Sequence, residues 1–143
     1  MRNARTLATA LSAVGIFLAA APGADAARLR TDRFPFGTWE NAKHTVRVKI
    51  ERCGDRACGR VIWASDDAKA DAAKGGTANL IGVQLFQGLA PGEDGVWAGK
   101  IFVPDLKGVF DGTVKSDDPT HLTAEGCVVK PVCKSQVWTR IGR

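Results

Sequence analysis

The sequence has few of the residues, and none of the motifs, on which most enzymes depend. Its 143 residues include two histidines, His44 and His121, and neither stands in a recognisable catalytic or metal-binding motif. A Walker loop, a nucleophile elbow and a His-Glu-His metal spacing are all missing. The adjacent acids Asp66-Asp67 and Asp117-Asp118 fall at an expected helix start and turn, where capping explains them better than acid and base roles. We therefore predict a protein that is not an enzyme and that has no cofactor or metal.

Long apolar runs are also scarce, because Leu7 to Ala21 is the only one. It is shorter than the roughly 20 residues that a membrane-spanning helix needs. The run follows Arg2 and Arg5 and precedes Pro22-Gly23 and Ala24-Asp25-Ala26, which gives the three regions of a secretory signal peptide. A permanent membrane helix is the weaker alternative. We expect residues 1–26 to be cleaved off after Ala26 and the mature protein to be periplasmic or secreted.

Cleavage would leave 117 of the 143 residues, enough for one domain and too few for two. Two arginines and one acid leave with the signal peptide, so 18 basic and 14 acidic residues remain, a net charge of +4. Residues 27–35 are a basic tail containing Arg28, Arg30 and Arg33, and residues 36–143 are the expected domain. An anionic membrane surface could attract the tail, although a solvated tail is commoner. Nucleic acid is not an expected partner in the exported compartment.

The four cysteines are Cys53, Cys58, Cys127 and Cys133. In a small exported domain they favour two disulfides, because the compartment is oxidising. Four and five residues separate the neighbouring cysteines, which fits poorly with the two-residue knuckles of most structural zinc sites. Catalytic thiols are a weaker interpretation, since an oxidised cysteine is not a nucleophile.

The segment from His44 to Ala64 predicts a β-hairpin, because apolar and polar residues alternate on both sides of a turn. We expect Cys53 opposite Cys58, around a four-residue loop from Gly54 to Ala57. In that register apolar residues face apolar ones and opposite charges meet. The expected pairs are Glu51 with Arg60, Ile50 with Val61 and Val48 with Trp63.

Short alternating segments, broken by turn residues at intervals near ten, continue to the end of the chain. The one long connection is Ser65 to Leu80, where Ser65 or Asp66 can cap a helix that Gly75-Gly76 end. A connection of this length is usually functional or disordered. The expected strands are Phe36–Glu40, two within His44–Ala64, Gly82–Leu89, Val96–Val103, Val109–Lys115, His121–Cys127 and Cys133–Arg140.

We predict that these eight strands close into a single all-β, antiparallel, up-and-down barrel, which removes the exposed edges of an open sheet. Connections would alternate between its two ends, so the two cysteine loops lie at opposite ends. This favours the local disulfides Cys53–Cys58 and Cys127–Cys133 among three possible connectivities. In the last hairpin, Cys127 opposite Cys133 sets Leu122 opposite Trp138 and Thr120 opposite Arg140.

The same alternation of ends places Trp39 and Arg140 together, where a cation–π pair would plug one end of the barrel. The opposite end would be a mouth with a mobile long loop and a crosslinked rim, leading to a pocket for a small apolar ligand. The same inner residues would also make an ordinary core, so the alternative is a solid barrel that serves as a structural or interaction module of the cell envelope. The expected pocket wall is Val48, Trp63, Phe86, Trp97, Ile101, Phe110, Leu122 and Trp138.

Several segments carry a family resemblance, the most specific being ACGRVIW, the W-x-G-K-I-x-x-P-D segment from Trp97 to Asp105, and the closing QVWTR from Gln136 to Arg140. With FGTWE near the start of the domain, they resemble the small exported bacterial proteins grouped as domain of unknown function 2147. The chain departs from the family pattern at Gly108-Val109-Phe110 and at Asn79-Leu80. The resemblance implies a lipocalin-like or streptavidin-like barrel, and it supplies neither catalytic residues nor a ligand.

Overall fold

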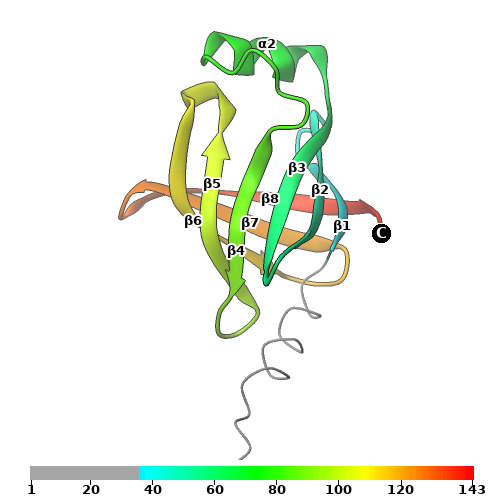
Figure 1. Ribbon diagram of the computed structural model, residues 1–143, viewed down its shortest axis with the longest axis vertical. Helices are drawn as coiled ribbons and strands as arrows, with labels where there is room; N and C mark the ends of the chain where they lie inside the picture. Colours follow the sequence, from blue (N-terminus) through cyan, green and yellow to red (C-terminus); the bar gives the residue numbers. More distant parts are fainter. Residues whose placement is uncertain (1–35) are drawn as a thin grey trace, which may run out of the picture.

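A computed structural model describes residues 36–143 of the chain; the predicted signal peptide and basic tail lie outside the described residues. Each strand pairs antiparallel with the next along the chain, and the last pairs with the first, so the sheet closes (Figure 1). The predicted eight-stranded up-and-down barrel is confirmed. The elements are β1 (Gly37–Asn41), β2 (Val46–Cys53), β3 (Arg56–Ala64), α2 (Asp66–Lys74), β4 (Gln84–Pro91), β5 (Val96–Val103), the 3-10 turn η1 (Pro104–Leu106), β6 (Gly108–Ser116), β7 (His121–Val129) and β8 (Val132–Gly142).

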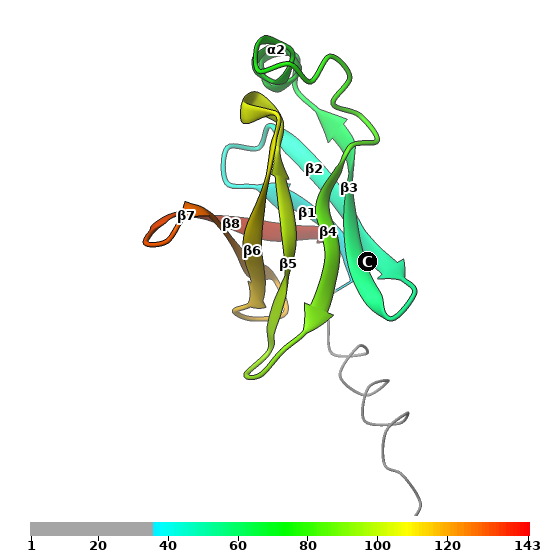
Figure 2. The same ribbon diagram turned by 60° about the vertical axis from the view of Figure 1, so that its left-hand side comes forward.

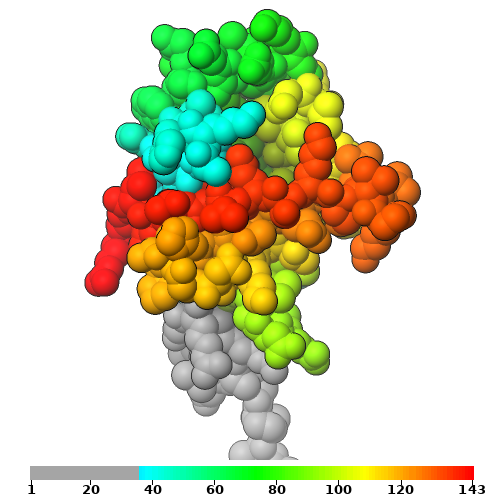
Figure 3. All heavy atoms as spheres, turned by 180° about the vertical axis from the view of Figure 1, so that it is seen from behind, coloured from blue at the N-terminus to red at the C-terminus, as the bar shows by residue number. Residues whose placement is uncertain are grey.

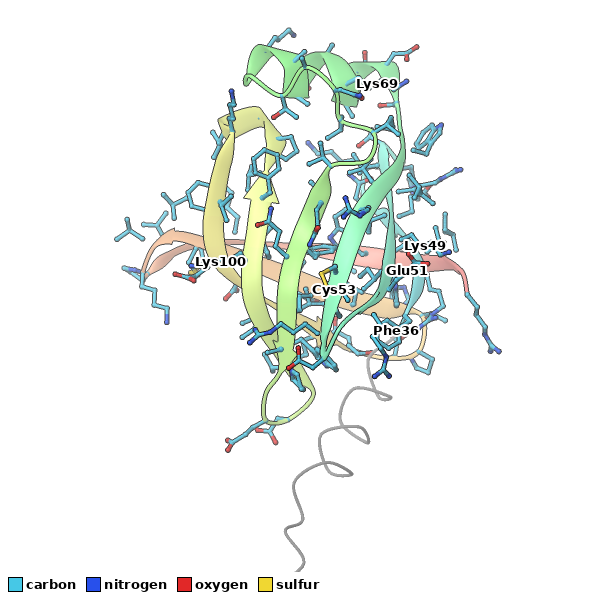
Figure 4. All side chains as sticks on the ribbon, in the orientation of Figure 1. Phe36, Lys49, Glu51, Cys53, Lys69 and Lys100 are labelled. Atoms are coloured by element: carbon cyan, nitrogen blue, oxygen red, sulfur yellow. A yellow bond between two sulfur atoms is a disulfide. The ribbon has the colours of Figure 1, made fainter. Side chains whose placement is uncertain are left out.

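The two ends of the barrel differ in what covers them. The mouth end carries the β1–β2 turn, α2, η1 and the β7–β8 turn, because successive connections alternate between ends. The plug end carries the start of β1 and the β2–β3, β4–β5 and β6–β7 turns. Helix α2 lies across the mouth end (Figures 1 and 2). Lys69 on α2 and Phe36 before β1 mark the mouth and plug ends in Figure 4.

Helix α2 has the boundaries that its sequence predicts. Ser65 caps it, and its side-chain oxygen accepts a hydrogen bond of 3.2 Å from Ala68 N. Asp66 and Asp67 occupy the first turn, where the helix dipole favours negative charge, and Lys74 occupies the last turn. Gly75 ends the helix, so nine residues of the long connection are helical.

The register predicted for the first hairpin is wrong by two residues. The β2–β3 turn contains only Gly54 and Asp55, and Cys53 lies opposite Arg56. Gly54 has a φ of 69°, which suits glycine at the first position of a tight hairpin turn. A shift of two residues leaves every side chain on its predicted face. The Cys53–Cys58 disulfide is therefore present, but it runs diagonally across the pair of strands.

A β-bulge then moves Trp63 from the predicted interior to the outer face. Val48 pairs with Val61 and Arg47 pairs with Trp63, so Ile62 has no partner on β2. The extra residue breaks the alternation, and Ile62 and Trp63 are 46% and 39% exposed. Alternation between faces assumes an unbroken ladder, and for this reason the placement of Trp63 in the pocket wall is a wrong prediction.

The last hairpin has the predicted register, with Cys127 opposite Cys133 and Leu122 opposite Trp138. Arg140 N donates to Thr120 O at 2.8 Å, which extends the same alignment beyond the strand. A disulfide joins Cys127 and Cys133 at the mouth end. Ala57 and Gly59 on either side of Cys58 are buried, and Gly126 and Lys134, next to Cys127 and Cys133, line the cavity. Because neighbouring side chains of a strand point to opposite faces, both disulfides lie on the outer face of the wall.

The plug half of the barrel is filled by close-packed side chains. Its inward residues are large, and none of them is more than 3% exposed. Packing of this kind matches the solid-barrel alternative, in which side chains alone fill the interior. These residues are Trp39, Val48, Ile50, Leu89, Trp97, Val114 and Leu122.

A row of inward glycines marks where the packed half stops. Gly99 lies opposite Gly112, and Gly112 lies opposite Gly126, so three adjacent strands have no side chain at this level. A Cβ atom on Gly112 would overlap the Ile101 side chain and lie 2.6 Å from the Glu125 carbonyl oxygen. A Cβ atom on Gly126 would lie 3.9 Å from Ile101 and touch nothing else nearby. Ile101 thus packs over this row.

These two glycines give a matched pair of variants. We expect Gly112→Ala to lower the free energy of unfolding by about 1–3 kcal/mol, because the Glu125 backbone cannot move aside without strain. Gly126→Ala should change it by less than about 1 kcal/mol. Denaturant midpoints measured for both variants check the expectation. Equal effects would show that the row is not packed as described.

Candidate functional site

The mouth half of the barrel contains an open cavity of about 690 Å³. In the view from behind, the surface is hollowed between the β1–β2 turn (cyan), the β5–β6 turn (yellow) and β8 (red), beneath α2 (green) (Figure 3). The volume falls within the range of about 300–1,000 Å³ typical of pockets for small molecules. The predicted mouth end therefore does hold a pocket.

The inner wall of the pocket is apolar, and its floor is aromatic. Phe86 and Trp138 are 1% and 4% exposed, and their rings meet edge to face with centroids 5.7 Å apart. Both line the cavity and belong to the core, so they form the floor between the pocket and the packed half. The remaining apolar wall comprises Val46, Leu80, Leu85, Ile101, Phe102, Val103, Phe110, Ala124, Gly126 and Val128.

The β1–β2 turn forms one side of the rim, and the Asn41 side chain shapes it. Asn41 Oδ1 accepts from Thr45 N at 2.8 Å and from Val46 N at 3.0 Å, while its Nδ2 donates to Thr45 Oγ1 at 3.0 Å. Asn41 is 6% exposed and lines the cavity. Its amide is therefore occupied by the turn, and Lys43 is the charged residue that the turn presents to the pocket.

Helix α2 roofs the pocket and is tied to the barrel on both sides. Ser65 N donates to Thr45 O at 2.8 Å, and Thr77 Oγ1 donates to Pro104 O at 2.9 Å. Gly75 lies so close to η1 that a Cβ atom there would overlap the Asp105 backbone. Ala72 is 2% exposed beneath the helix. The long connection, predicted to be mobile, is a roof held by hydrogen bonds at both ends.

Charge divides the rim into two sides. Asp67, Asp71 and Asp105, from α2 and η1, line one side of the cavity. Lys43 and Lys134, from the β1–β2 turn and β8, line the other. Ser135 and Gln136 add polar groups beside Lys134. A ligand with an apolar body and a polar end would have both of its parts accommodated.

A family model described as "uncharacterized protein conserved in bacteria (DUF2147)" matches residues 37–140, from the first residue of β1 nearly to the end of β8. The chain belongs to DUF2147. The resemblance to this family is thus confirmed. Searches of curated proteins and of solved structures each found no match.

The plug end of this DUF2147 barrel holds the predicted pair. The Arg140 guanidinium carbon lies 4.6 Å from the centroid of the buried Trp39 ring. Arg140 Nη1 donates to Phe36 O at 2.7 Å, and its Nε donates to Pro119 O at 2.8 Å. Burial, and then the charge of the nearby Arg143, lower the pKa of the Arg140 guanidinium below its ordinary range. Arg140 therefore ties the segment before β1 to the β6–β7 turn.

The eight residues predicted for the pocket wall fall into three groups. Phe86, Ile101, Phe110 and Trp138 line the cavity. The other inward residues, Val48, Trp97 and Leu122, lie in the packed half, and Trp63 lies outside the barrel. Sequence reasoning did not predict the polar residues of the rim, nor the wall residues Leu80, Leu85 and Ala124. The alternation of apolar residues along their strands could have suggested Leu85 and Ala124. Their height along the barrel axis could be known only from the pairing registers between neighbouring strands.

Potential metal ligands within residues 36–143 converge in one place, at Glu125, Cys127 and Cys133. Both sulfur atoms are joined in the disulfide, so neither is a free thiolate that could bind a metal.

No helix of the described chain is long and apolar enough to cross a membrane.

An ionic cluster supports the β1–β2 side of the rim from outside. The side chain of Glu40 is 11% exposed; Oε2 lies 2.6 Å from His44 Nδ1, and Oε1 accepts from Arg47 Nε at 2.8 Å. These hydrogen bonds, from His44 first and then Arg47, lower the pKa of the Glu40 carboxyl below its ordinary 4.5. The Arg47 guanidinium carbon also lies 4.5 Å from the centroid of the Trp63 ring.

This cluster makes stability depend on pH. Because folding lowers the pKa of Glu40, the stabilisation is present above the unfolded value of about 4.5 and is lost as pH falls through the lower folded value. We expect Glu40→Gln to lower the free energy of unfolding by about 1 kcal/mol at pH 7. The difference from the parent should shrink below pH 4.5, as measured by denaturation at several pH values. In the exposed control Glu51→Gln this pH dependence should persist, and its loss there would contradict the assignment to Glu40.

Proposed function

We propose that this DUF2147 protein binds a small, largely apolar molecule in the mouth half of its barrel. The observation that carries the proposal is the cavity of about 690 Å³ whose floor and walls are aromatic and aliphatic. Gly126 supports it, because this residue lines the cavity and supplies no side chain that could fill the space. We further propose that the protein acts as a carrier or sensor of its ligand.

The polar rim narrows the class of ligand. Lys43 and Lys134 stand at the mouth on one side, with Gln136 between Lys134 and the aromatic floor along β8. A carboxylate or another anionic group could remain there, hydrated and close to the lysines, while the apolar body enters the barrel. A medium-chain fatty acid has this chemistry.

A solid barrel that acts as an interaction module of the cell envelope is the second candidate. The packed plug half supports it, as do Ile62 and Trp63, which are exposed on the outer face. The pocket has no part in this alternative. A failure of the protein to bind any apolar probe would favour it.

We also infer that the protein is exported. Two disulfides support an oxidising compartment, and the N-terminal residues have the pattern of a secretory signal. Expression in a bacterium with export active should give a periplasmic or secreted form that begins at Ala27, as measured by intact mass. Recovery of a chain that retains residues 1–26 would contradict the inference.

The binding test uses a dansyl-labelled undecanoic acid as probe and unlabelled laurate as competitor, with lipid-free protein. We expect a saturable rise in dansyl emission that laurate reverses. Energy transfer from Trp138 on the floor should persist in a Trp63→Phe background, because Trp63 lies outside the barrel.

Variants at Gly126 show whether the probe occupies the pocket. Gly126→Leu should weaken binding at least tenfold, because the side chain would enter the cavity, and Gly126→Ala should have a smaller effect. Glu125→Leu adds the same side chain at the neighbouring, exposed position and is the control. Circular dichroism and thermal unfolding establish that each variant is folded. Equal affinity in Gly126→Leu and Glu125→Leu, or no saturable signal at all, would refute the proposed pocket.

A further inference from the structure

We propose that the tip of the β7–β8 hairpin, residues Val128 to Val132, docks the protein on an anionic lipid surface. The exposed fractions of Val128, Val129 and Val132 are 57%, 68% and 63%. The hairpin, drawn in orange, projects beyond the rest of the barrel wall (Figures 1 and 2). Three large apolar side chains are therefore presented together at a projecting point.

The strand pairing holds these valines in a fixed arrangement. Val129 lies directly opposite Val132, and the Cys127–Cys133 disulfide closes the base of the tip. The connection between them is Lys130-Pro131. A short crosslinked hairpin has few alternative conformations in which its valines could be buried against the barrel. The exposed apolar surface is thus a stable feature of the fold.

Charge on the hairpin favours an anionic surface as the occupant. Lys130 lies within the tip, and Lys134 follows on β8. The acid nearest in sequence, Glu125, is beyond the disulfide, and Asp111 on β6 is bound by Lys100 Nζ at 2.6 Å. Hydrogen bonding and charge from Lys100, with a smaller effect of Lys130, lower the pKa of the Asp111 carboxyl.

The acidic residues of the pocket rim do not belong to the hairpin tip. Asp67 and Asp71 belong to α2, and Asp105 belongs to η1, whereas the tip is formed by β7 and β8. An apolar tip flanked by lysines matches the boundary between headgroups and acyl chains, where valines enter the apolar layer and lysines meet anionic lipid.

Docking through this tip would bring the pocket to the lipid. Val128 and Lys134 belong both to the hairpin and to the cavity lining, so the rim is continuous with the tip. An apolar molecule leaving the bilayer would meet the mouth without crossing bulk water. The docking goes beyond the proposed ligand binding and depends chiefly on Val129, Lys130 and Val132, which do not line the cavity, so either can fail while the other holds.

The experiment is co-sedimentation of the mature protein with vesicles of phosphatidylcholine, with and without 30–40% phosphatidylglycerol. We expect binding to the anionic vesicles that weakens at high salt, and little binding to phosphatidylcholine alone. Two double variants of the tip should each lower the partition coefficient at least tenfold. One is Val129→Ser/Val132→Ser, and the other is Lys130→Gln/Lys134→Gln. The control Val137→Ser/Ile141→Ser removes two exposed apolar side chains of β8 outside the tip and should change it less than twofold.

Three results would overturn the proposal. The first is no binding to anionic vesicles, and the second is an equal loss in the control variant. The third is self-association without vesicles that Val129→Ser/Val132→Ser abolishes, because the tip would then join two copies of this chain. Gly126→Leu, which fills the pocket, should bind vesicles like the parent. This result separates failure of docking from failure of ligand binding.

Discussion

The space inside a closed eight-stranded barrel is set by the number and tilt of its strands, and the inward side chains decide how much of it is filled. In this protein they fill one half and leave the other open. Trp39, Trp97 and Leu122 occupy the plug half, whereas Gly126 lines the cavity and contributes no side chain to it. The packed interior that the solid-barrel alternative expects is present in one half of the molecule, and the other half holds an open cavity.

The open half is held in shape by hydrogen bonds and a disulfide around its rim. Helix α2 is fixed through Ser65 and Thr77, the β1–β2 turn through Asn41, and the projecting hairpin through its disulfide. Arg140 joins chain segments at the opposite end. The mouth can therefore keep its shape without a ligand, which lowers the entropy that binding would otherwise lose.

The architecture was predictable because closure and alternation depend on pattern alone. The residues alone predicted the strand count, the helix capped by Ser65, the register of the last hairpin and the separation of the mouth end from the plug end. The first hairpin did not, because Gly54 allows a two-residue turn where spacing between cysteines suggested four. The prediction for Trp63 was wrong for a different reason. The unpaired residue Ile62 reverses the faces of the residues that follow it, and no local sequence pattern marks that bulge.

The pocket was predictable in position but only partly in composition. Ile101, Phe110 and Trp138 could be assigned from the face of the strand on which they lie, whereas the pattern of β4 leaves the face of Phe86 open. Val48 and Leu122 face inward too, but they lie in the packed half. The face on which a side chain lies follows from the period of two along its strand. Its height along the barrel axis follows from the stagger between neighbouring strands. That stagger depends on the turns and bulges, which are set by tertiary packing.

The most direct test of a half-filled barrel is a titration of isotope-labelled protein with laurate, followed through backbone amide chemical shifts. The account predicts saturable changes at Ile101, Phe110 and Gly126, with Val114 and Leu122 in the packed half unchanged. Shifts confined to Ile62 and Trp63 on the outer face, or none up to the solubility limit of laurate, would contradict it.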